Sequence, residues 1–268
     1  MPPSNTSLTR AQAARIRNLT RDKRARRLDG AFVIEGAKPV RDLLLTHPAE
    51  IQMLVMTSGF IRRESEQERL IRESAGVPSY QCRERDFSAM SDLEAPQGVL
   101  AVVRKPSWNE REVLDRPKLL GLYGEGLQDP ANVGAIIRTA AGLNADALWL
   151  TPESADVYNP KVVRATSGAL LTFPIFILPD VAQLVRQGCA VFSAEASGRG
   201  TCSMDTIRAV PPKLIIALGN ESRGLSVATT RQAACRFTIP LDRQVESLNV
   251  AATAAIAIYY LRKLPKRP

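Results

Sequence analysis

The second half of the chain carries a regular series of short apolar runs, separated by stretches of helical composition. The runs are Leu119–Tyr123, Ala147–Thr151, Pro174–Leu178, Ala190–Ala194, Lys213–Leu218 and Phe237–Pro240. Short, nearly continuous apolar runs of this kind are typical of strands in a parallel sheet that helices cover on both faces. Such sheets bind ligands at the carboxyl ends of their strands. We therefore expect a site in the loops after Tyr123, Leu218 and Pro240.

The first hundred residues also alternate between strand-like and helix-like segments. Strands are expected over residues 31–36, 51–56, 77–82 and 98–103, and helices over 38–45 and 64–75. This pattern predicts a small α/β domain. The charged stretch 104–118, with Pro106 and Pro117, is typical of a domain boundary. We expect a binding domain over 1–105 with a basic opening helix, a linker over 106–118, and a second domain over 119–268.

The positive charge of the chain is concentrated near its beginning. The net charge is +9, and residues 10–27 hold eight basic residues and one acidic residue, which leaves only +2 for the rest. A solvated helix face would explain a shorter run, but this excess favours a surface that binds nucleic-acid phosphates. An anionic membrane is less favoured, because bulky aromatic residues are missing from the segment. The expected RNA contacts are Arg15, Arg21, Lys23, Arg24, Arg26 and Arg27, with Arg164 added from the second half.

Several classes of protein are disfavoured by residue usage. The composition, 45% hydrophobic and 24% charged, is that of a globular protein. The only histidine is His47, so triads and His-rich metal sites would have to use it, and we expect no metal. The four cysteines form no CxxC pair and are expected to be reduced. No signal peptide or membrane span is expected, which predicts a cytoplasmic protein.

Two familiar phosphate-binding motifs are nearly present, and both fail. Gly124 and Gly126 begin a GxGxxG pattern, but its third glycine position is Asp129. The segment Gly219–Ser226 has P-loop glycine spacing, but Leu225 replaces the lysine. Neither a nicotinamide enzyme nor a P-loop ATPase is supported.

Three polar clusters remain, and each has a structural alternative. In DPANVGAIIR, Asn132 could cap a helix with Arg138 further along it, which could also be a simple surface arginine. In LGNESRG, glycines allow a tight loop around Glu221, or an ordinary strand-to-helix turn. In the third cluster, Ser247 or Asn249 would begin an alanine-rich helix that could pack closely inside the fold or across a dimer.

In this order, the clusters resemble the three motifs of the SPOUT superfamily, specifically its SpoU (TrmH-type) branch of S-adenosylmethionine-dependent RNA ribose 2′-O-methyltransferases. The matching segments are NVGAIIR, LGNESRG, and IPL followed by SLNVAATAA, and the resemblance covers about 119–262. The first half resembles, more loosely, the substrate-binding domain that precedes this catalytic domain in many members. Its matching pieces are the basic opening helix, FVIEG and APQGVLAVV.

The resemblance implies a fold, a methyl donor and an assembly. The fold would be a small N-terminal L30e-like α/β domain, followed by a parallel-sheet SPOUT domain with a deep trefoil knot. Two copies of the chain would dimerise through the SPOUT domain. S-adenosylmethionine would bind in the knotted loops. The implied donor-binding residues are Leu218, Gly219, Asn220, Glu221, Gly224, Ile239, Pro240, Leu241, Ser247 and Leu248.

The resemblance also implies the catalytic residues Arg138, Asn132, Glu221, Ser247 and Asn249. A guanidinium is a poor base, because its pKa lies above ~12. We therefore expect Arg138 to grip an RNA phosphate, place the 2′-hydroxyl and stabilise charge on its oxygen. The expected substrate is 23S-type ribosomal RNA. The alternatives are a tRNA ribose methyltransferase, a SPOUT enzyme that methylates a base, and a non-catalytic ribosome assembly factor on the same fold.

Overall fold

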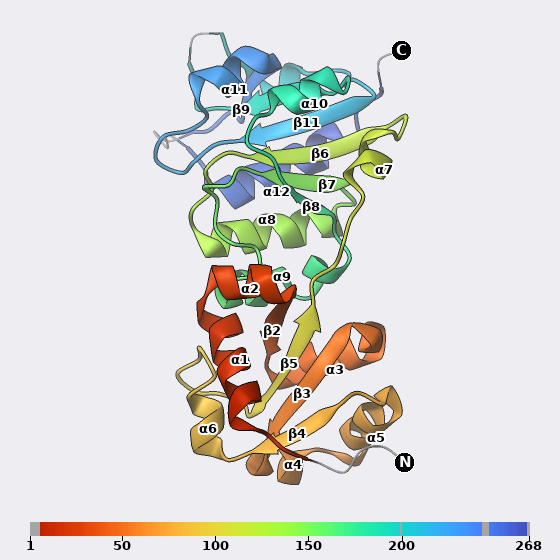
Figure 1. The fold of residues 1–268 in the computed structure, drawn as a ribbon. Helices are drawn as coiled ribbons and strands as arrows, with labels where there is room; N and C mark the ends of the chain where they lie inside the picture. The colour runs from red at the N-terminus through yellow and green to blue at the C-terminus, as the bar shows by residue number, and fades with distance from the viewer. Residues whose placement is uncertain (1–5, 199, 243–246, 267–268) are drawn as a thin grey trace. The chain divides into compact units, whose positions relative to one another are not determined.

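The computed structural model describes residues 6–198, 200–242 and 247–266, and it divides into two compact units (Figure 1). The N-terminal unit comprises Met1–Pro106 and Asp156–Leu171, and the C-terminal unit comprises Ser107–Ala155 and Thr172–Pro268. This grouping differs from a split at a linker over 106–118. That stretch contains α7 (Glu110–Leu114), whose Val113 lies in the core of the C-terminal unit. The segment Asp156–Leu171 instead belongs to the N-terminal unit.

The basic opening segment forms two helices, not the single helix expected. They are α1 (Arg10–Arg21) and α2 (Lys23–Asp29). The break lies at Asp22, whose backbone is extended (φ −118°, ψ 120°) and whose carboxylate accepts a hydrogen bond from the Arg24 amide at 2.8 Å. Asp22 thus ends α1 and caps α2, because its side chain satisfies an amide that has no partner within the helix.

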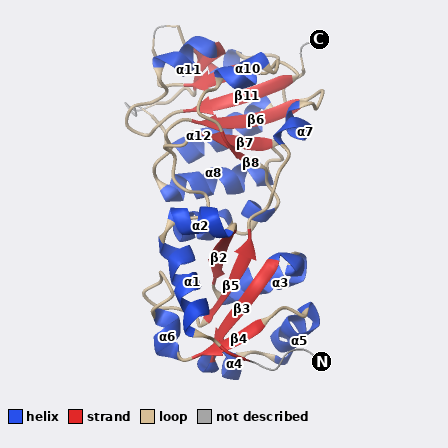
Figure 2. Ribbon diagram, in the orientation of Figure 1, coloured by secondary structure: helices blue, strands red, loops and turns tan. Residues whose placement is uncertain are grey.

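A five-stranded mixed sheet forms the centre of the N-terminal unit (Figure 2). The strand order is β1-β4-β3-β5-β2; β5 is antiparallel to both β2 and β3, and the remaining pairs are parallel. The strands are β1 (Thr6–Ser7), β2 (Ala31–Glu35), β3 (Ile51–Thr57), β4 (Ser79–Cys82) and β5 (Val99–Arg104). The four strands predicted from the sequence are confirmed, and β1 was not foreseen.

Helices surround this sheet. They are α3 (Ala37–Thr46), the 3₁₀ turn Pro48–Glu50, α4 (Ser58–Arg63), α5 (Glu66–Ala75), α6 (Glu84–Ser88), α9 (Pro160–Thr166) and the 3₁₀ turn Ala169–Leu171. The two predicted helices correspond to α3 and α5. Ile16 and Leu19 of α1 pack with Val33, Val55 and Leu100 of the sheet, and all five are buried. This apolar face anchors α1.

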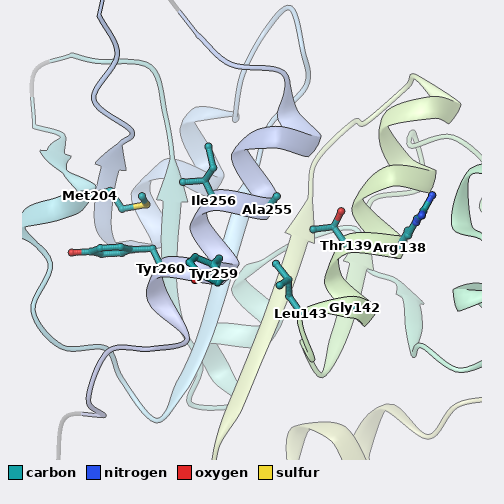
Figure 3. A pocket seen from close by; sticks show the side chains of 9 residues that line it. All are labelled: Arg138, Thr139, Gly142, Leu143, Met204, Ala255, Ile256, Tyr259 and Tyr260. Carbon is teal, nitrogen blue, oxygen red and sulfur yellow. The ribbon is translucent and has the colours of Figure 1, made fainter.

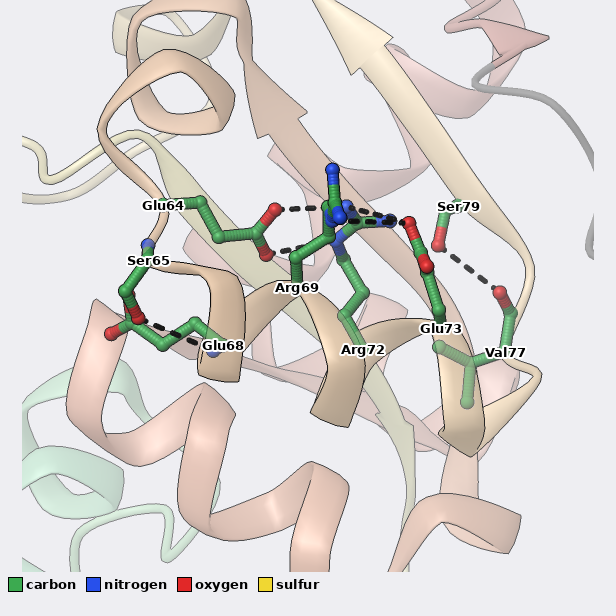
Figure 4. Close-up of polar contacts among 8 residues, drawn as sticks. All are labelled: Glu64, Ser65, Glu68, Arg69, Arg72, Glu73, Val77 and Ser79. Carbon is green, nitrogen blue, oxygen red and sulfur yellow. Dashed lines mark hydrogen bonds and ion pairs between the residues drawn. The ribbon is translucent and has the colours of Figure 1, made fainter.

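Capping and a buried ion pair hold α5 in place (Figure 4). Ser65 and Glu68 form a capping box at its start, where the Ser65 amide donates to Glu68 Oε2 at 2.9 Å. Arg72 donates from Nε and Nη2 to the two oxygens of Glu64, at 2.9 and 2.8 Å. The two side chains are only 11% and 4% exposed. The hydrogen bonds that Arg72 donates to Glu64 raise the pKa of Arg72, and the burial of the Arg72 side chain opposes this rise.

The C-terminal unit contains a seven-stranded sheet in which every pair of neighbours is parallel, as predicted. The order is β10-β12-β9-β11-β6-β7-β8. The strands are β6 (Leu119–Gly124), β7 (Ala147–Leu150), β8 (Ile175–Ile177), β9 (Ala190–Ala194), β10 (Cys202–Ser203), β11 (Lys213–Leu218) and β12 (Ala233–Thr238). The last strand begins earlier than expected and ends before Ile239. The trefoil knot stays a prediction.

Helices cover both faces of this sheet, as expected (Figure 1). They are α8 (Pro130–Gly142), α10 (Ala182–Arg186), the 3₁₀ turn Met204–Thr206, α11 (Val227–Gln232) and α12 (Val250–Leu261). Alternate residues of the strands, such as Tyr123, Trp149 and Ala217, pack with Leu184 of α10 on one face. On the other face α8 and α12 pack against each other. Within the described ranges, none of the helices has the length and apolar character that crossing a membrane requires.

We expect Glu64→Ala to lower the free energy of unfolding by ~3 kcal/mol, because it leaves the buried Arg72 guanidinium without its partner. Urea unfolding followed by circular dichroism measures this change. Glu73→Ala is the matched control, because Glu73 is 43% exposed and lies 3.9 Å from Arg72; its effect should stay within ~0.5 kcal/mol. Equal effects of the two substitutions would contradict a structural role for the buried pair.

Candidate active site

Three loops meet at the carboxyl edge of the parallel sheet. They follow β6, β11 and β12, which lie within four neighbouring positions of the strand order β12-β9-β11-β6. Each loop carries one of the three polar clusters singled out in the sequence. The Glu125 amide, directly after β6, donates to the Leu218 carbonyl at the end of β11 at 2.9 Å. The first two loops are therefore joined through their backbones.

Asn249, Asn132 and Glu221 form a chain of hydrogen bonds that links all three clusters. Asn249 Nδ2 donates to Asn132 Oδ1 at 2.8 Å, and Asn132 Nδ2 donates to Glu221 Oε1 at 2.9 Å. Asn132 is only 8% exposed, whereas Asn249 and Glu221 are exposed. The structure thus brings together three of the five residues expected to be catalytic.

The direction of this chain follows from the start of α12. Asn249 is the N-cap of α12, and its Oδ1 accepts hydrogen bonds from the amides of Ala251 and Ala252, at 2.9 and 3.4 Å. Its amide nitrogen is left to donate to Asn132, which in turn must donate to Glu221. A carboxylate suits the end of this chain, because it only accepts hydrogen bonds when ionised. Of the two residues expected to begin the helix, Asn249 does so.

Asn132 does not cap α8, contrary to one reading of the sequence. The N-cap is Asp129, whose carboxylate accepts a hydrogen bond from the Ala131 amide at 2.9 Å, and Pro130 occupies the first turn. Asn132 is therefore free of capping and can turn inward. Val133, Ile136 and Ile137 of the same helix are fully buried, as expected.

The loop Leu218–Gly224 closes on itself tightly. The Asn220 amide donates to the Gly224 carbonyl at 3.1 Å, and the Gly224 amide donates back at 2.9 Å. A Cβ atom on Gly219 would lie 2.3 Å from the carbonyl carbon of Gly224, and Gly224 has a left-handed φ of +67°. Both positions thus require glycine, in one case for space and in the other for backbone conformation.

Asn220 shapes this loop with its side chain. Its Oδ1 accepts from the amides of Ser222 and Arg223, and its Nδ2 donates to the Gly126 carbonyl at 2.7 Å. The expected role of Asn220 in donor binding is thus restricted, because its carboxamide is already used within the protein. Leu218 is 1% exposed, so it offers only its backbone.

The remaining residues expected to bind the donor lie around this loop. Ile239 and Leu248 are half-buried, and Pro240, Leu241 and Ser247 are exposed. The exposed fraction of Leu241 is 37%. Ser247 has no hydrogen bond to any residue within the described ranges, so the structure does not join it to Asn132 and Glu221.

Arg138 is turned away from the hydrogen-bonded chain. It follows Asn132 by six residues on α8, which places the two side chains about 120° apart around the helix. Arg138 is exposed, and among the described residues its guanidinium has no ion pair or hydrogen bond. It lines a cavity of about 640 Å³ between α8 and α12, at the end away from Tyr259 and Tyr260 (Figure 3). The expected grouping of Arg138 with Asn132 is therefore not found within one chain.

Two residues that hold the site, Thr151 and Ser154, lie in the loop after β7 and were not predicted from the sequence. Thr151 Oγ1 accepts from the Gly126 amide at 2.9 Å, and Ser154 Oγ accepts from the Leu127 amide at 3.2 Å. Both side chains are buried and hold the loop that begins α8. Serine and threonine after a strand are too common for the sequence alone to single them out.

Glu195 follows β9, between the ends of β12 and β11, and was also missed. It accepts hydrogen bonds from Ser193 Oγ at 2.6 Å and from Arg236 Nη2 at 2.7 Å. Burial opposes ionisation of Glu195, but the hydrogen bonds and charge of Arg236 and the hydroxyl of Ser193 outweigh it, so the pKa of Glu195 lies below its usual range. The pair stabilises the strand ends from which Ile239 extends.

The basic residues of the N-terminal unit fall into two groups. Arg21, Lys23, Arg24 and Arg27 are exposed, as an RNA contact requires. Arg15 is half-buried and forms an ion pair with Asp29 at 2.6 Å, and Arg164 forms one with Asp92 at 3.0 Å.

Arg26 is a correction to the sequence prediction. It is only 2% exposed, and its guanidinium bonds to Asp156 and to the carbonyls of Leu19 and Thr20. A side chain enclosed in this way cannot contact an RNA phosphate. We therefore assign Arg26 a structural role.

The loops at the sheet edge fit S-adenosylmethionine by their chemistry. Partly exposed apolar side chains of Ile239, Leu241 and Leu248 suit an adenine ring and a thioether chain, and the Leu218–Gly224 backbone offers amides and carbonyls. No group of three His, Cys, Asp or Glu side chains in the described part of the chain is arranged as metal ligands would be.

Comparison with known proteins identifies both units. Residues 120–259 match the model of the SpoU rRNA Methylase family, and residues 13–101 match the MRM3-like substrate binding domain. The chain is 31% identical over 243 residues to 23S rRNA (guanosine(2553)-2′-O)-methyltransferase RlmP of Bacillus subtilis, which covers 90% of this chain and 92% of that relative. It is 29% identical to the 23S rRNA (uridine(2479)-2′-O)-methyltransferase of Streptomyces viridochromogenes, over 90% and 84% of the two chains.

A solved structure agrees with these matches. The crystal structure of an AdoMet-bound rRNA methyltransferase from Sinorhizobium meliloti superimposes with a TM-score of 0.80 at 27% identity and covers 96% of each chain. The family match spans more than half of the chain and contains all three hydrogen-bonded residues, Asn132, Glu221 and Asn249. The chain therefore belongs to the SpoU rRNA methylase family.

Proposed function

We propose that this protein transfers a methyl group from S-adenosylmethionine to a ribose 2′-hydroxyl of 23S-type ribosomal RNA. The observation that carries the proposal is the chain Asn249–Asn132–Glu221, which joins the three family motifs at the carboxyl edge of the sheet. Two relatives that match along most of their length are named as 23S rRNA 2′-O-methyltransferases, which favours ribosomal RNA over tRNA and ribose over base. With ribosomal RNA as its substrate, the protein would act in the cytoplasm.

In the proposed reaction S-adenosylmethionine supplies a methyl group that its sulfonium already activates. The protein must bring the ribose oxygen into line and accept charge and a proton from the hydroxyl. Glu221 is held by Asn132 through Oε1, which leaves Oε2 to accept a hydrogen bond from the ribose. Arg138 grips a phosphate and stabilises the negative charge that develops on the oxygen.

A second copy of the chain is the proposed occupant of the α8/α12 face. Ile256 is 39% exposed and Tyr259 is 54% exposed, and both line the cavity with Leu143 and Ala255 (Figure 3). Small residues in α12 let a neighbouring backbone approach closely. Because Arg138 lines the same cavity, dimerisation would place it at the junction of two chains and explain why it is turned away from Asn132.

Arg138→Ala should keep the affinity for S-adenosylmethionine and lower turnover by at least ~10²-fold, because it removes an electrostatic group that acts on the reacting oxygen. Calorimetry measures the first quantity and transfer of a labelled methyl group to ribosomal RNA the second. Arg186→Ala, which removes an exposed arginine of α10, is the control, and its S-adenosylmethionine affinity and turnover should equal those of wild type. Near-normal turnover of the Arg138 variant would contradict its assignment.

Ile256→Glu should convert a dimer into monomers, because it places a charge in the proposed apolar interface. Sedimentation velocity measures the change in mass. Leu70→Glu alters an exposed leucine of α5 and should leave the mass unchanged. If wild-type protein sediments as a monomer, or if the Ile256 variant still sediments as a dimer, this interface is wrong.

Replacing the four exposed basic residues of α1 and α2 by glutamine should weaken RNA binding and reduce its salt dependence. The residues are Arg21, Lys23, Arg24 and Arg27. Each lost phosphate contact lowers the slope of log affinity against log salt by ~0.7–0.9. Filter binding at several salt concentrations measures the slope.

The control for this change removes the same charge elsewhere. Exposed basic residues of the C-terminal unit serve this purpose: Arg111, Lys118, Arg186 and Arg231. Their replacement by glutamine should leave the slope nearly unchanged. Equal slopes for the two quadruple variants would show that α1 and α2 are not the phosphate-binding surface.

A further inference from the structure

The segment Asp156–Leu171 lies within the residues that match the methylase family model, but it belongs to the N-terminal unit. Its helix α9 packs against β2. The Tyr158 ring lies 5.0 Å from the Phe32 ring, and the Lys105 ammonium lies 4.3 Å from the Tyr158 ring centre. The segment Asp156–Leu171, from the part of the sequence that matches the methylase family, is thus packed into the unit that contains α1 and α2.

A buried ion pair ties this segment to α2. Arg26 Nε and Nη2 lie 2.8 and 2.7 Å from Asp156 Oδ2, and the two side chains are only 3% and 13% exposed. Arg26 Nη1 donates to the carbonyls of Leu19 and Thr20, at 2.7 and 3.2 Å, in the last turns of α1. One guanidinium therefore fastens α2 to α1 and to Asp156 at the same time.

Helix α2, which Arg26 anchors, depends on other parts of the unit for its orientation. It has seven residues, begins at the break at Asp22, and ends at Gly30. Isolated helices of this length are unstable in water, so α2 depends on tertiary contacts. Arg26 is its only buried residue, whereas Arg24 and Arg27 are exposed. The directions of these two arginines thus depend on the anchor between them.

We propose that Asp156 is a positioning residue for RNA: through its ion pair with Arg26 it holds α2 so that Arg24 and Arg27 meet RNA phosphates. The assignment rests on the proposed RNA function. Removing an acid from a basic surface ordinarily strengthens RNA binding, because repulsion of the phosphates falls. Here the loss of the acid should weaken binding.

Asp156→Asn should lower the affinity for unmodified 23S rRNA transcribed in vitro by about tenfold and reduce the salt slope by about two, because two phosphate contacts are lost. Glu153→Gln is the matched control, since Glu153 is an exposed acid three residues earlier. It should leave the affinity unchanged or slightly higher. Asp156→Glu keeps the charge and should recover part of the slope.

Thermal unfolding and calorimetric S-adenosylmethionine binding check that each variant is folded. If Asp156→Asn does not fold, Arg26→Lys serves in its place. Lysine keeps the positive charge of the pair but lacks the planar guanidinium that bonds several partners, so this variant should lower the salt slope of RNA binding in the same way. An affinity of folded Asp156→Asn equal to or above that of wild type overturns the assignment. So does a weaker affinity with an unchanged slope, which would indicate general damage.

Failure of the proposed function would look different. Wild-type protein would then bind the transcript weakly at every salt concentration, or without salt dependence, and both proposals would fall. A normal wild-type slope with an unaffected Asp156→Asn variant removes only the positioning role of Asp156.

Discussion

The hydrogen-bonded chain from Asn249 through Asn132 to Glu221 is the contact on which the proposed active site depends. Each bond sets the direction of the next, because capping of α12 fixes the amide of Asn249, and this amide fixes that of Asn132. The three residues lie 89 and 117 positions apart in sequence. The parallel sheet brings them together, because the loops that carry them follow strands whose ends meet at one edge. The parallel-sheet fold therefore assembles the proposed catalytic residues.

The loops around this chain are held in shape by hydrogen bonds of their own. Asn220, Gly219 and Gly224 use their backbone and side-chain groups to close the second loop. The hydroxyls of Thr151 and Ser154 hold the first loop by accepting hydrogen bonds from its amides. A site built mainly from backbone and apolar groups suits a methyl donor that is already activated and needs positioning above all.

Much of this architecture could be predicted from the sequence, because it rests on local signals. Apolar runs such as Lys213–Leu218 and the alternation of strands with helices predicted the parallel sheet. The cluster around Asn132 was implied by the resemblance of the three motifs to the SpoU branch. Other features depend on long-range contacts, which the sequence does not show. The sequence shows Arg26 as one of eight similar basic residues, and only its distant partner Asp156 makes it structural. The six-residue spacing on α8 already places Arg138 about 120° away from Asn132 around the helix, but only the structure shows that Arg138 lines the cavity beside α12.

Methylation of ribose by this site can be tested by incubating purified protein with methyl-labelled S-adenosylmethionine and unmodified ribosomal RNA. The product is then digested with a nuclease that requires a free 2′-hydroxyl. We expect label in 23S rRNA, held in a dinucleotide that resists cleavage because the 2′-oxygen is methylated. Label recovered in single nucleotides would contradict ribose as the acceptor. An absence of both label and S-adenosylmethionine binding would contradict the enzyme itself.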